Sequence, residues 1–199
     1  MRGVWIDKGQ EPDYAKLASL SITEVCFDIR DPALSRAFLQ HVQGQGFAPG
    51  VYACSQGEGW PTSLSGAQFS DWVETRVRPL NVSQNIPFVH LNSETHDVTW
   101  LVSMLNRWRE LRPKKRTLWG FEGMQGGLFT PPDVDLIEGL NLEYGPQSYT
   151  GSMERLESAT VVLDLVTRGF SAERIHPFLD AAQLGVWWQG WAFPQGRLP

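Results

Sequence analysis

The sequence predicts an α/β protein folded as a compact (β/α)8 barrel of the TIM type. Strand-like and helix-like segments alternate along the chain, and such alternation is typical of a parallel sheet. The strand-like segments number eight, which is the count of a closed barrel. No break in composition and no Ser/Gly-rich linker divides the chain, so residues 1–199 are expected to form a single domain.

The first half of the chain supplies three strands and their helices. Residues 4–7 are rich in β-formers, and residues 14–20 follow as a short helix. In residues 24–29 alternate positions are apolar, as in a strand, and Asp31 with Pro32 then predicts the cap and first turn of a helix that ends at Gly44 or Gly46. Residues 50–54 form the third strand, and a long loop leads to a helix over 67–77.

The second half repeats the alternation. A strand over 87–93 leads to Asp97, which is expected to cap an amphipathic helix with its apolar stripe at Val98, Leu101, Val102, Leu105, Trp108 and Leu111. The remaining strands are expected over 116–121, 142–144, 175–179 and 185–189, and the remaining helices over 133–139 and 152–167. Some helices are short, and none follows the last strand. A six-stranded open sheet is the alternative.

Composition excludes several classes of protein. With 42% hydrophobic residues and nine tryptophans, the chain can bury a core and is not disordered. A net charge of −5 argues against binding to nucleic acid through phosphate neutralisation. No run approaches the 18 or so apolar residues of a membrane span, so no membrane insertion is expected. The first residues enter a strand pattern and not an apolar leader, which predicts synthesis in the cytoplasm without a signal peptide.

Candidate site residues follow from the fold, because active sites of such barrels lie at the carboxyl ends of the strands. The polar and aromatic residues at those ends are Asp7, Asp28, Arg30, Tyr52, His90, Asn92, Glu94, Glu122, Gln147, Tyr149, Asp180, Trp188, Gln189 and Trp191. Most of these are expected to bind substrate. Four carboxylates, namely Glu94, Asp7, Asp28 and Glu122, are the catalytic candidates.

The fourth strand is the most informative. Alternation places His90, Asn92 and Glu94 on its barrel face, and three inward polar residues are costly to bury unless they are used or well paired. Glu94 at the strand tip suits a general acid, and a second carboxylate from another strand would complete the pair used in glycoside hydrolysis. In the structural alternative, Asp28 and Arg30 neutralise each other and Glu94 bonds a loop amide.

A metal site is the competing interpretation of this strand. His90, Glu94 and His96 could ligate a metal of a hydrolytic enzyme, but their spacing matches no established metal signature. The sequence therefore predicts no metal and no cofactor, and a metal-dependent hydrolase remains a third hypothesis.

Several segments together resemble a known family. Arg2-Gly3-Val4-Trp5-Ile6-Asp7, Asp13-Tyr14-Ala15-Lys16-Leu17-Ala18 and Ile22-Thr23-Glu24-Val25-Cys26-Phe27 run as strand, aspartate, short helix and strand. Pro49-Gly50-Val51-Tyr52, Phe88-Val89-His90-Leu91-Asn92-Ser93-Glu94 and Trp187-Trp188-Gln189 continue this order over nearly the whole chain. In this order the sequence resembles the lysozyme-type muramidases of glycoside hydrolase family 25, which occur in bacteriophage lysis and tail proteins.

The resemblance implies a glycosidase barrel with Glu94 as the proton donor. The family carries Asp-x-Glu on the fourth strand, whereas this chain has Asn92 in the aspartate position. Either Asp7, Asp28 or Glu122 replaces that aspartate, or the barrel binds glycan without cleaving it.

Two functions from different classes follow. The first is a glycoside hydrolase-like protein that cleaves bacterial cell-wall polysaccharide, with a phage origin as one option and with Tyr52, Tyr149, Trp188 and Trp191 as the sugar platform. The second is a catalytically silent barrel that serves as a structural or glycan-binding part of a phage virion. The expected partners are accordingly cell-wall glycan and, in the second case, other virion proteins.

Overall fold

A computed structural model describes residues 2–80, 86–93, 95–122, 129–147, 154–176, 178–179 and 190–192. The strands are β1 (Arg2–Ile6), β2 (Glu24–Asp28), β3 (Ala48–Cys54), β4 (Phe88–Ser93), β5 (Arg116–Glu122), β6 (Glu143–Gln147), β7 (Phe178–Leu179) and β8 (Gly190–Ala192). The helices are α1 (Tyr14–Ser19), α2 (Arg36–Gly44), α3 (Gly66–Leu80), α4 (Val98–Leu111), α5 (Pro131–Gly139) and α6 (Glu154–Thr167), with a 3-10 turn at Ala172–Arg174.

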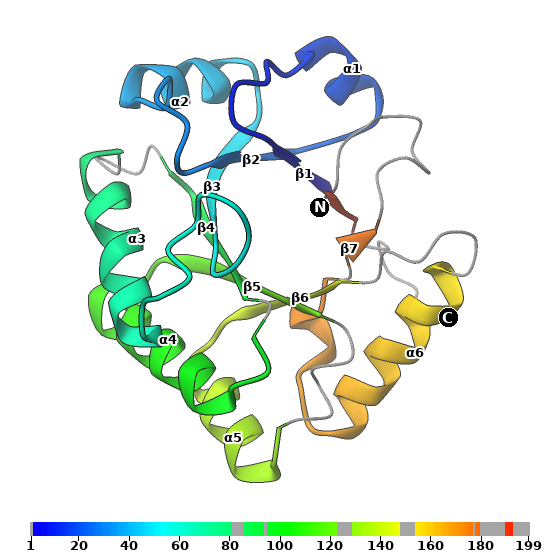
Figure 1. Ribbon diagram of the computed structural model, residues 1–199. Coiled ribbons are helices and arrows are strands. Elements are labelled where there is room, and N and C mark those ends of the chain that lie inside the picture. The colour runs from blue at the N-terminus through cyan, green and yellow to red at the C-terminus, as the bar shows by residue number, and fades with distance from the viewer. Residues whose placement is uncertain are drawn as a thin grey trace.

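The predicted α/β architecture is confirmed as a curled sheet of six parallel strands with helices outside it. Strands β1 to β6 pair in sequence order, each parallel to the next. Figure 1 shows the helices arranged around the outside of these strands. The strand order then continues through β7 and β8 back to β1, which closes the ring of hydrogen-bonded pairs.

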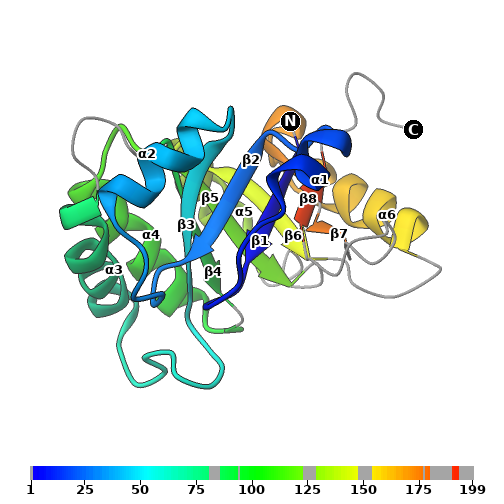
Figure 2. The same ribbon diagram turned by 90° about the horizontal axis from the view of Figure 1, so that it is seen from above.

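The eight parallel strand–helix units of a full (β/α)8 barrel are not confirmed. β8 is antiparallel to both of its neighbours, β1 and β7, and Figure 2 shows the two short strands beside β1 and β6. The described part of β7 covers two residues, and β8 lies at 190–192. Residues 185–189, where the last strand was expected, lie outside the described residues. The alternative of a six-stranded open sheet does not hold either, because β7 pairs parallel to β6 and β8 joins β7 to β1.

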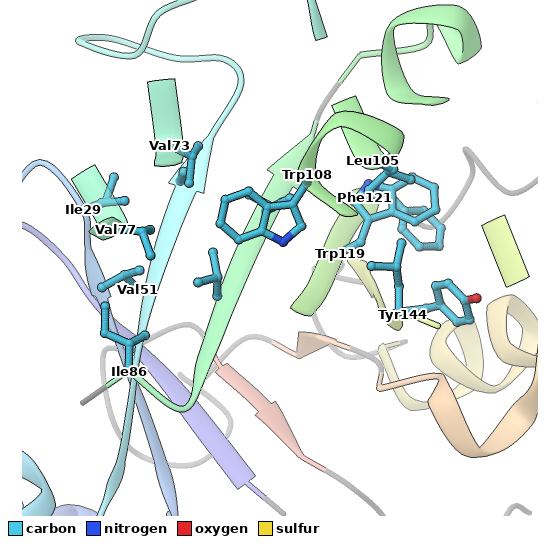
Figure 3. Packing of buried hydrophobic residues seen from close by; sticks show 14 of the residues in the cluster. Ile29, Val51, Val73, Val77, Ile86, Leu105, Trp108, Trp119, Phe121 and Tyr144 are labelled. Carbon is cyan, nitrogen blue, oxygen red and sulfur yellow. The ribbon is translucent and has the colours of Figure 1, made fainter. Parts of the chain in front are cut away.

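The larger core lies between the sheet and the helices. Alternate residues of the strands, such as Val51 and Trp119, are fully buried there against helix residues such as Val73 and Trp108. Figure 3 shows the aliphatic part of this layer and the aromatic part around Trp119. Trp108 also donates its indole N–H to the Thr117 hydroxyl at 2.8 Å. Alternation therefore fixes which strand residues face the helices and which face the inside of the sheet.

A smaller apolar cluster fills the inside of the curled sheet. It consists of Trp5, Cys26, Phe88 and Leu118, with Tyr52 packed against it. A Cβ on Gly50 would lie 2.3 Å from the Phe88 ring, so glycine makes room for that ring. These side chains close the inside of the sheet below the carboxyl ends of the strands.

Buried charges occupy the opposite, amino-terminal end. The Arg116 guanidinium bridges two carboxylates, contacting Glu24 through Nη1 and Glu143 through Nε and Nη2. Glu24 is only 2% exposed. His176 lies 3.3 Å from Glu143. Although burial raises the pKa of Glu143, the hydrogen bonds from His176 and Arg116 lower it to about 2.

The two predicted helix starts differ in outcome. Asp97 caps α4 as expected, accepting from the Trp100 N–H at 3.1 Å. Asp31 does not cap α2, because that helix starts at Arg36 with Ser35 as its N-cap. The Asp31 carboxylate instead accepts from the N–H groups of Gly9 and Ala33, so it links the loops after β1 and β2. Among the described helices, none is both long and apolar enough to cross a lipid bilayer.

Gly66 sets how closely α3 approaches α4. A Cβ there would lie 2.1 Å from the Trp100 carbonyl oxygen and 2.8 Å from the Met104 nitrogen, both backbone atoms. We therefore expect Gly66→Ala to lower the free energy of unfolding by about 1–3 kcal/mol, because backbone atoms cannot move aside as a flexible side chain can.

Urea unfolding followed by tryptophan fluorescence measures this effect. Gly44→Ala is the matched control, since a Cβ on Gly44 in α2 would contact nothing within 4 Å. Alanine favours helix, so this control should be neutral or up to about 1 kcal/mol more stable. Equal unfolding midpoints for the two variants would contradict the close packing of α3 on α4.

Candidate functional site

The carboxyl ends of β1 to β4 bring several of the predicted site residues together. The described side chains at this mouth are those of Asp7, Asp28, Arg30, Tyr52, His90 and Asn92. Glu122 lies in β5, Gln147 in β6 and Trp191 in β8. For these three residues the structure describes the backbone but not the side chain. Glu94, Tyr149, Asp180, Trp188 and Gln189 fall outside the described residues.

Asp28 and Arg30 form an ion pair, as in the structural alternative. Asp28 is 1% exposed, and Arg30 holds it through Nε at 3.0 and 3.1 Å and through Nη2 at 2.6 Å. The Arg30 N–H adds a further hydrogen bond of 2.8 Å to the same carboxylate. Hydrogen bonds therefore already occupy both oxygens of Asp28, which makes it a poorer catalytic candidate than Asp7.

Asp7 is an exposed carboxylate directly after β1. Its Oδ1 accepts a hydrogen bond from the Tyr52 hydroxyl at 2.9 Å, and none of the described residues donates to Oδ2. Burial, followed by the charges of Asp28 and Asp7, raises the pKa of Tyr52 well above its ordinary value. The hydroxyl therefore stays protonated and keeps donating to Oδ1 of Asp7, whereas Oδ2 accepts no hydrogen bond from the described residues.

Four aromatic rings extend outward from the interior past this carboxylate. The Trp5 and Tyr52 centroids are 6.2 Å apart, those of Tyr52 and Trp60 are 6.0 Å apart, and those of Trp60 and Trp72 are 6.1 Å apart. The Arg30 guanidinium lies 3.7 Å from the Trp60 ring centroid and donates to the Glu58 carbonyl, which holds this loop. We call Trp5, Tyr52, Trp60 and Trp72 the aromatic row.

Of the four residues in this row, only Tyr52 was among the residues expected at the site. Trp5 lies within β1, Trp60 in the loop after β3 and Trp72 on α3, whereas the candidate residues were expected at the strand ends. A signal was present for Trp60, which stands in a loop rich in Gly and Ser directly after a strand end. In the structure Trp60 and Trp72 are partly buried and also pack against the larger core. The row provides apolar ring faces beside a carboxylate.

His90 lies on the inner face of β4, as alternation predicted, and is fully buried. Its Nδ1 accepts from the Trp5 indole N–H at 2.9 Å. In a neutral imidazole the hydrogen is then on Nε2. Burial lowers the pKa of His90 from 6.5 to about 3, so the ring is neutral at pH 7 and orients Trp5.

This lowered pKa predicts a specific loss of stability in acid. Below pH 6.5 the unfolded chain binds a proton at His90, whereas the folded protein does not until about pH 3. The free energy of unfolding should therefore fall by up to about 1.4 kcal/mol per pH unit as the pH drops through this window. His90→Gln, whose amide oxygen can accept from Trp5, should show a flatter pH dependence in guanidinium unfolding between pH 6.5 and 4.5. Parallel curves for the two proteins would contradict a neutral His90.

Asn92 and His90, the described inward polar residues of β4, belong to no described cluster of possible metal ligands. The Asn92 amide donates to Cys54 Sγ at 3.3 Å. Of the histidines in the metal hypothesis, His90 is buried and His96 is exposed. Within the described part of the chain, no group of three or more His, Cys, Asp or Glu side chains is arranged to hold a metal ion.

Two hollows lie at opposite ends of the sheet. The one at the amino-terminal end measures about 490 Å³ and includes Arg109, which donates to the backbone carbonyls of Leu140 and Asn141. Such hydrogen bonds tie loops together. The other hollow measures about 460 Å³ and lies at the carboxyl end, beside Arg30 and Trp60. Because the carboxyl end carries chemistry in barrel folds, we take the second hollow and the mouth as the candidate site.

Comparison with known proteins supports the fold. No protein-family model matches the sequence, and no curated protein matches it. The catalytic domain of a mannanase from Streptomyces sp. SirexAA-E is similar in structure, with a TM-score of 0.61 and 12% identity over 85% of this chain. An uncharacterized B. stearothermophilus protein covers 74% of each chain at 14% identity, with a TM-score of 0.48. This chain spans 63% of the mannanase domain, and that likeness shows a shared TIM-like α/β fold.

Proposed function

We propose that the protein is a glycoside hydrolase-like enzyme that cleaves bacterial cell-wall polysaccharide. The observation that carries the proposal is Asp7, an oriented and solvent-accessible carboxylate beside the aromatic row. Sugar rings stack their C–H faces on aromatic side chains, and glycoside hydrolysis requires carboxylates next to the bound sugar. The likeness in fold to a mannanase catalytic domain agrees with this class of reaction.

In the proposed mechanism Glu94 is the general acid. The sequence puts Glu94 directly after Ser93, the last residue of β4, and the resemblance to family 25 gives it this role. Glu94 would protonate the glycosidic oxygen as the bond to the sugar carbon breaks. Asp7 would stabilise the oxocarbenium-like state or orient the attacking water, with Tyr52 holding its carboxylate. Asp28 would keep Arg30 in place, and Glu122 remains a second candidate for the partner carboxylate.

The remaining predicted residues would bind the glycan. Arg30, His90 and Asn92 would shape the mouth. The other proposed sugar contacts are Gln147, Tyr149, Asp180, Trp188, Gln189 and Trp191, all from the later strand ends.

Clearing of purified cell walls from several bacterial classes tests the proposal, with the wild type and Glu94→Gln assayed side by side. We expect turbidity to fall and reducing ends to form with the wild type, and neither with Glu94→Gln. Clearing by both proteins would move the acid role to Glu122. The absence of clearing by either protein would refute the proposed hydrolysis.

A silent glycan-binding barrel of a phage virion is the second candidate. Asn92 favours it, because the family aspartate is replaced by an amide that donates to Cys54. Binding of wall glycan without release of reducing ends, together with a fixed copy number in virions, would support this role over catalysis.

A further inference from the structure

The hollow at the carboxyl end is unusual in its charge. The residues that line it are Lys8, Ile29, Arg30, Gly59, Trp60, Pro61, Trp72 and Arg76. Three of them are cationic and none is acidic, although the whole chain carries a net charge of −5. A cavity that concentrates positive charge on an acidic protein favours an anionic ligand.

Two of the three cations are not neutralised by the described residues. Arg30 is paired with Asp28, but no described carboxylate lies within ion-pair distance of Lys8 or Arg76. The Arg76 guanidinium lies 3.8 Å from the Trp72 ring centroid, and within the described residues it donates one hydrogen bond, to the Trp72 carbonyl at 3.4 Å. Burial lowers the pKa of Arg76, as expected for a cation partly removed from water without a counter-ion.

The hollow is continuous with the candidate site. Trp60 lines the hollow on one side and packs beside Tyr52 on the other, with ring centroids 6.0 Å apart. Tyr52 in turn holds Asp7. A saccharide that lies against Tyr52 therefore reaches the hollow within one further sugar unit along the aromatic row.

We propose that this hollow binds a sugar unit that carries a carboxylate, with the ring against Trp60 and Trp72 and the carboxylate on Arg76 and Lys8. This inference rests on the proposed function for its choice of a saccharide. The planes of the two indoles are inclined at 67°, so they do not form the parallel slot that sandwiches a nucleobase. The Arg30 and Arg76 guanidiniums lie over the Trp60 and Trp72 rings, and Phe69 stacks on Trp72, so a sugar would contact the indole surface that these groups leave uncovered.

Matched pairs of disaccharides test the proposal by calorimetric titration. GlcNAc–MurNAc and diacetylchitobiose share their rings and acetamides and differ by an ether-linked carboxylate. Digalacturonate and galactobiose differ by ring carboxylates, so the two pairs distinguish the sources of the charge. We expect the acidic member of at least one pair to bind about tenfold more tightly, and this preference to shrink as salt is added.

Arg76→Gln and Lys8→Gln should each remove most of this preference while leaving the affinity for the neutral sugar within about twofold. Arg78→Gln is the control, because it removes the same charge from the same helix but lies outside the hollow, 74% exposed and paired with Glu74. Thermal unfolding of each variant verifies that it folds.

Equal binding of acidic and neutral sugars in both pairs would overturn the proposal. So would an effect of Arg78→Gln as large as that of Arg76→Gln, or tighter binding of a mononucleotide such as UMP than of any acidic sugar. The titrations need no turnover. A preference for acidic sugars without clearing of walls would support this inference and refute the proposed hydrolysis. Clearing of walls without such a preference would support the hydrolysis and refute this inference.

Discussion

Asp7→Asn is expected to reduce the rate of wall hydrolysis by about 10²- to 10⁴-fold, the range attributed to a positioned acid–base group. The substitution keeps an oxygen that can accept from Tyr52 but removes the negative charge that faces the sugar. Release of reducing ends per minute at saturating wall concentration measures the effect. Because Asp7 is exposed, the free energy of unfolding should change by no more than about 0.5 kcal/mol.

Tyr52→Phe separates the charge of Asp7 from its orientation. This variant retains the carboxylate but loses the 2.9 Å hydrogen bond that fixes it, so a smaller loss of about tenfold is expected. Asp31→Asn is a matched control, because Asp31 is another carboxylate near the mouth whose hydrogen bonds go to Gly9 and Ala33. Wild-type activity in Asp7→Asn would exclude Asp7 and direct attention to Glu122.

The longer strands were predictable because strands buried on both faces appear in the sequence as short runs of apolar and β-forming residues, and residues 117–121 of β5 are all buried. Residues 116–121 were expected to form a strand, and β5 covers Arg116–Glu122. Its Trp119 faces the helices while Leu118 faces inward. The antiparallel β8 was not predictable, because its three residues carry too short a pattern and its direction depends on how the chain returns to β1. The role of Asp31 also depends on a neighbouring loop, which no local motif reveals.

The site was predictable to the extent that it lies on strands. Asp28 and Arg30 are two residues apart, which places both on one side of the chain, and the ion pair was foreseen as an alternative to catalysis. Trp60 and Trp72 come from a loop and a helix, and only the folded chain brings them beside Tyr52. The periodicity of strands therefore predicts which carboxylates lie at the mouth of a barrel, but it does not predict which loop and helix residues form the binding surface beside them.

Arg116→Met is expected to lower the free energy of unfolding at pH 7 by about 3–5 kcal/mol, the cost of removing one partner from a buried ion pair. Methionine keeps much of the apolar stem but leaves Glu24 and Glu143 without the guanidinium that bridges them. Arg168→Met is the control. It removes an exposed i,i+4 pair with Asp164 and should cost less than about 1 kcal/mol.

The pH dependence of this difference distinguishes electrostatics from lost packing. In the wild type the pKa of Glu143 is about 2, below its ordinary 4.5, so its contribution to stability is complete above pH 4.5 and is lost as the pH falls toward 2. Without Arg116, burial favours the neutral form of Glu143. Protonation of Glu143 in acid therefore stabilises the variant relative to the wild type. The gap between the two proteins in urea unfolding should therefore narrow from pH 7 to pH 3.5. A gap that stays constant over this range would mean that Arg116 acts through its packing, because lost van der Waals contacts do not titrate.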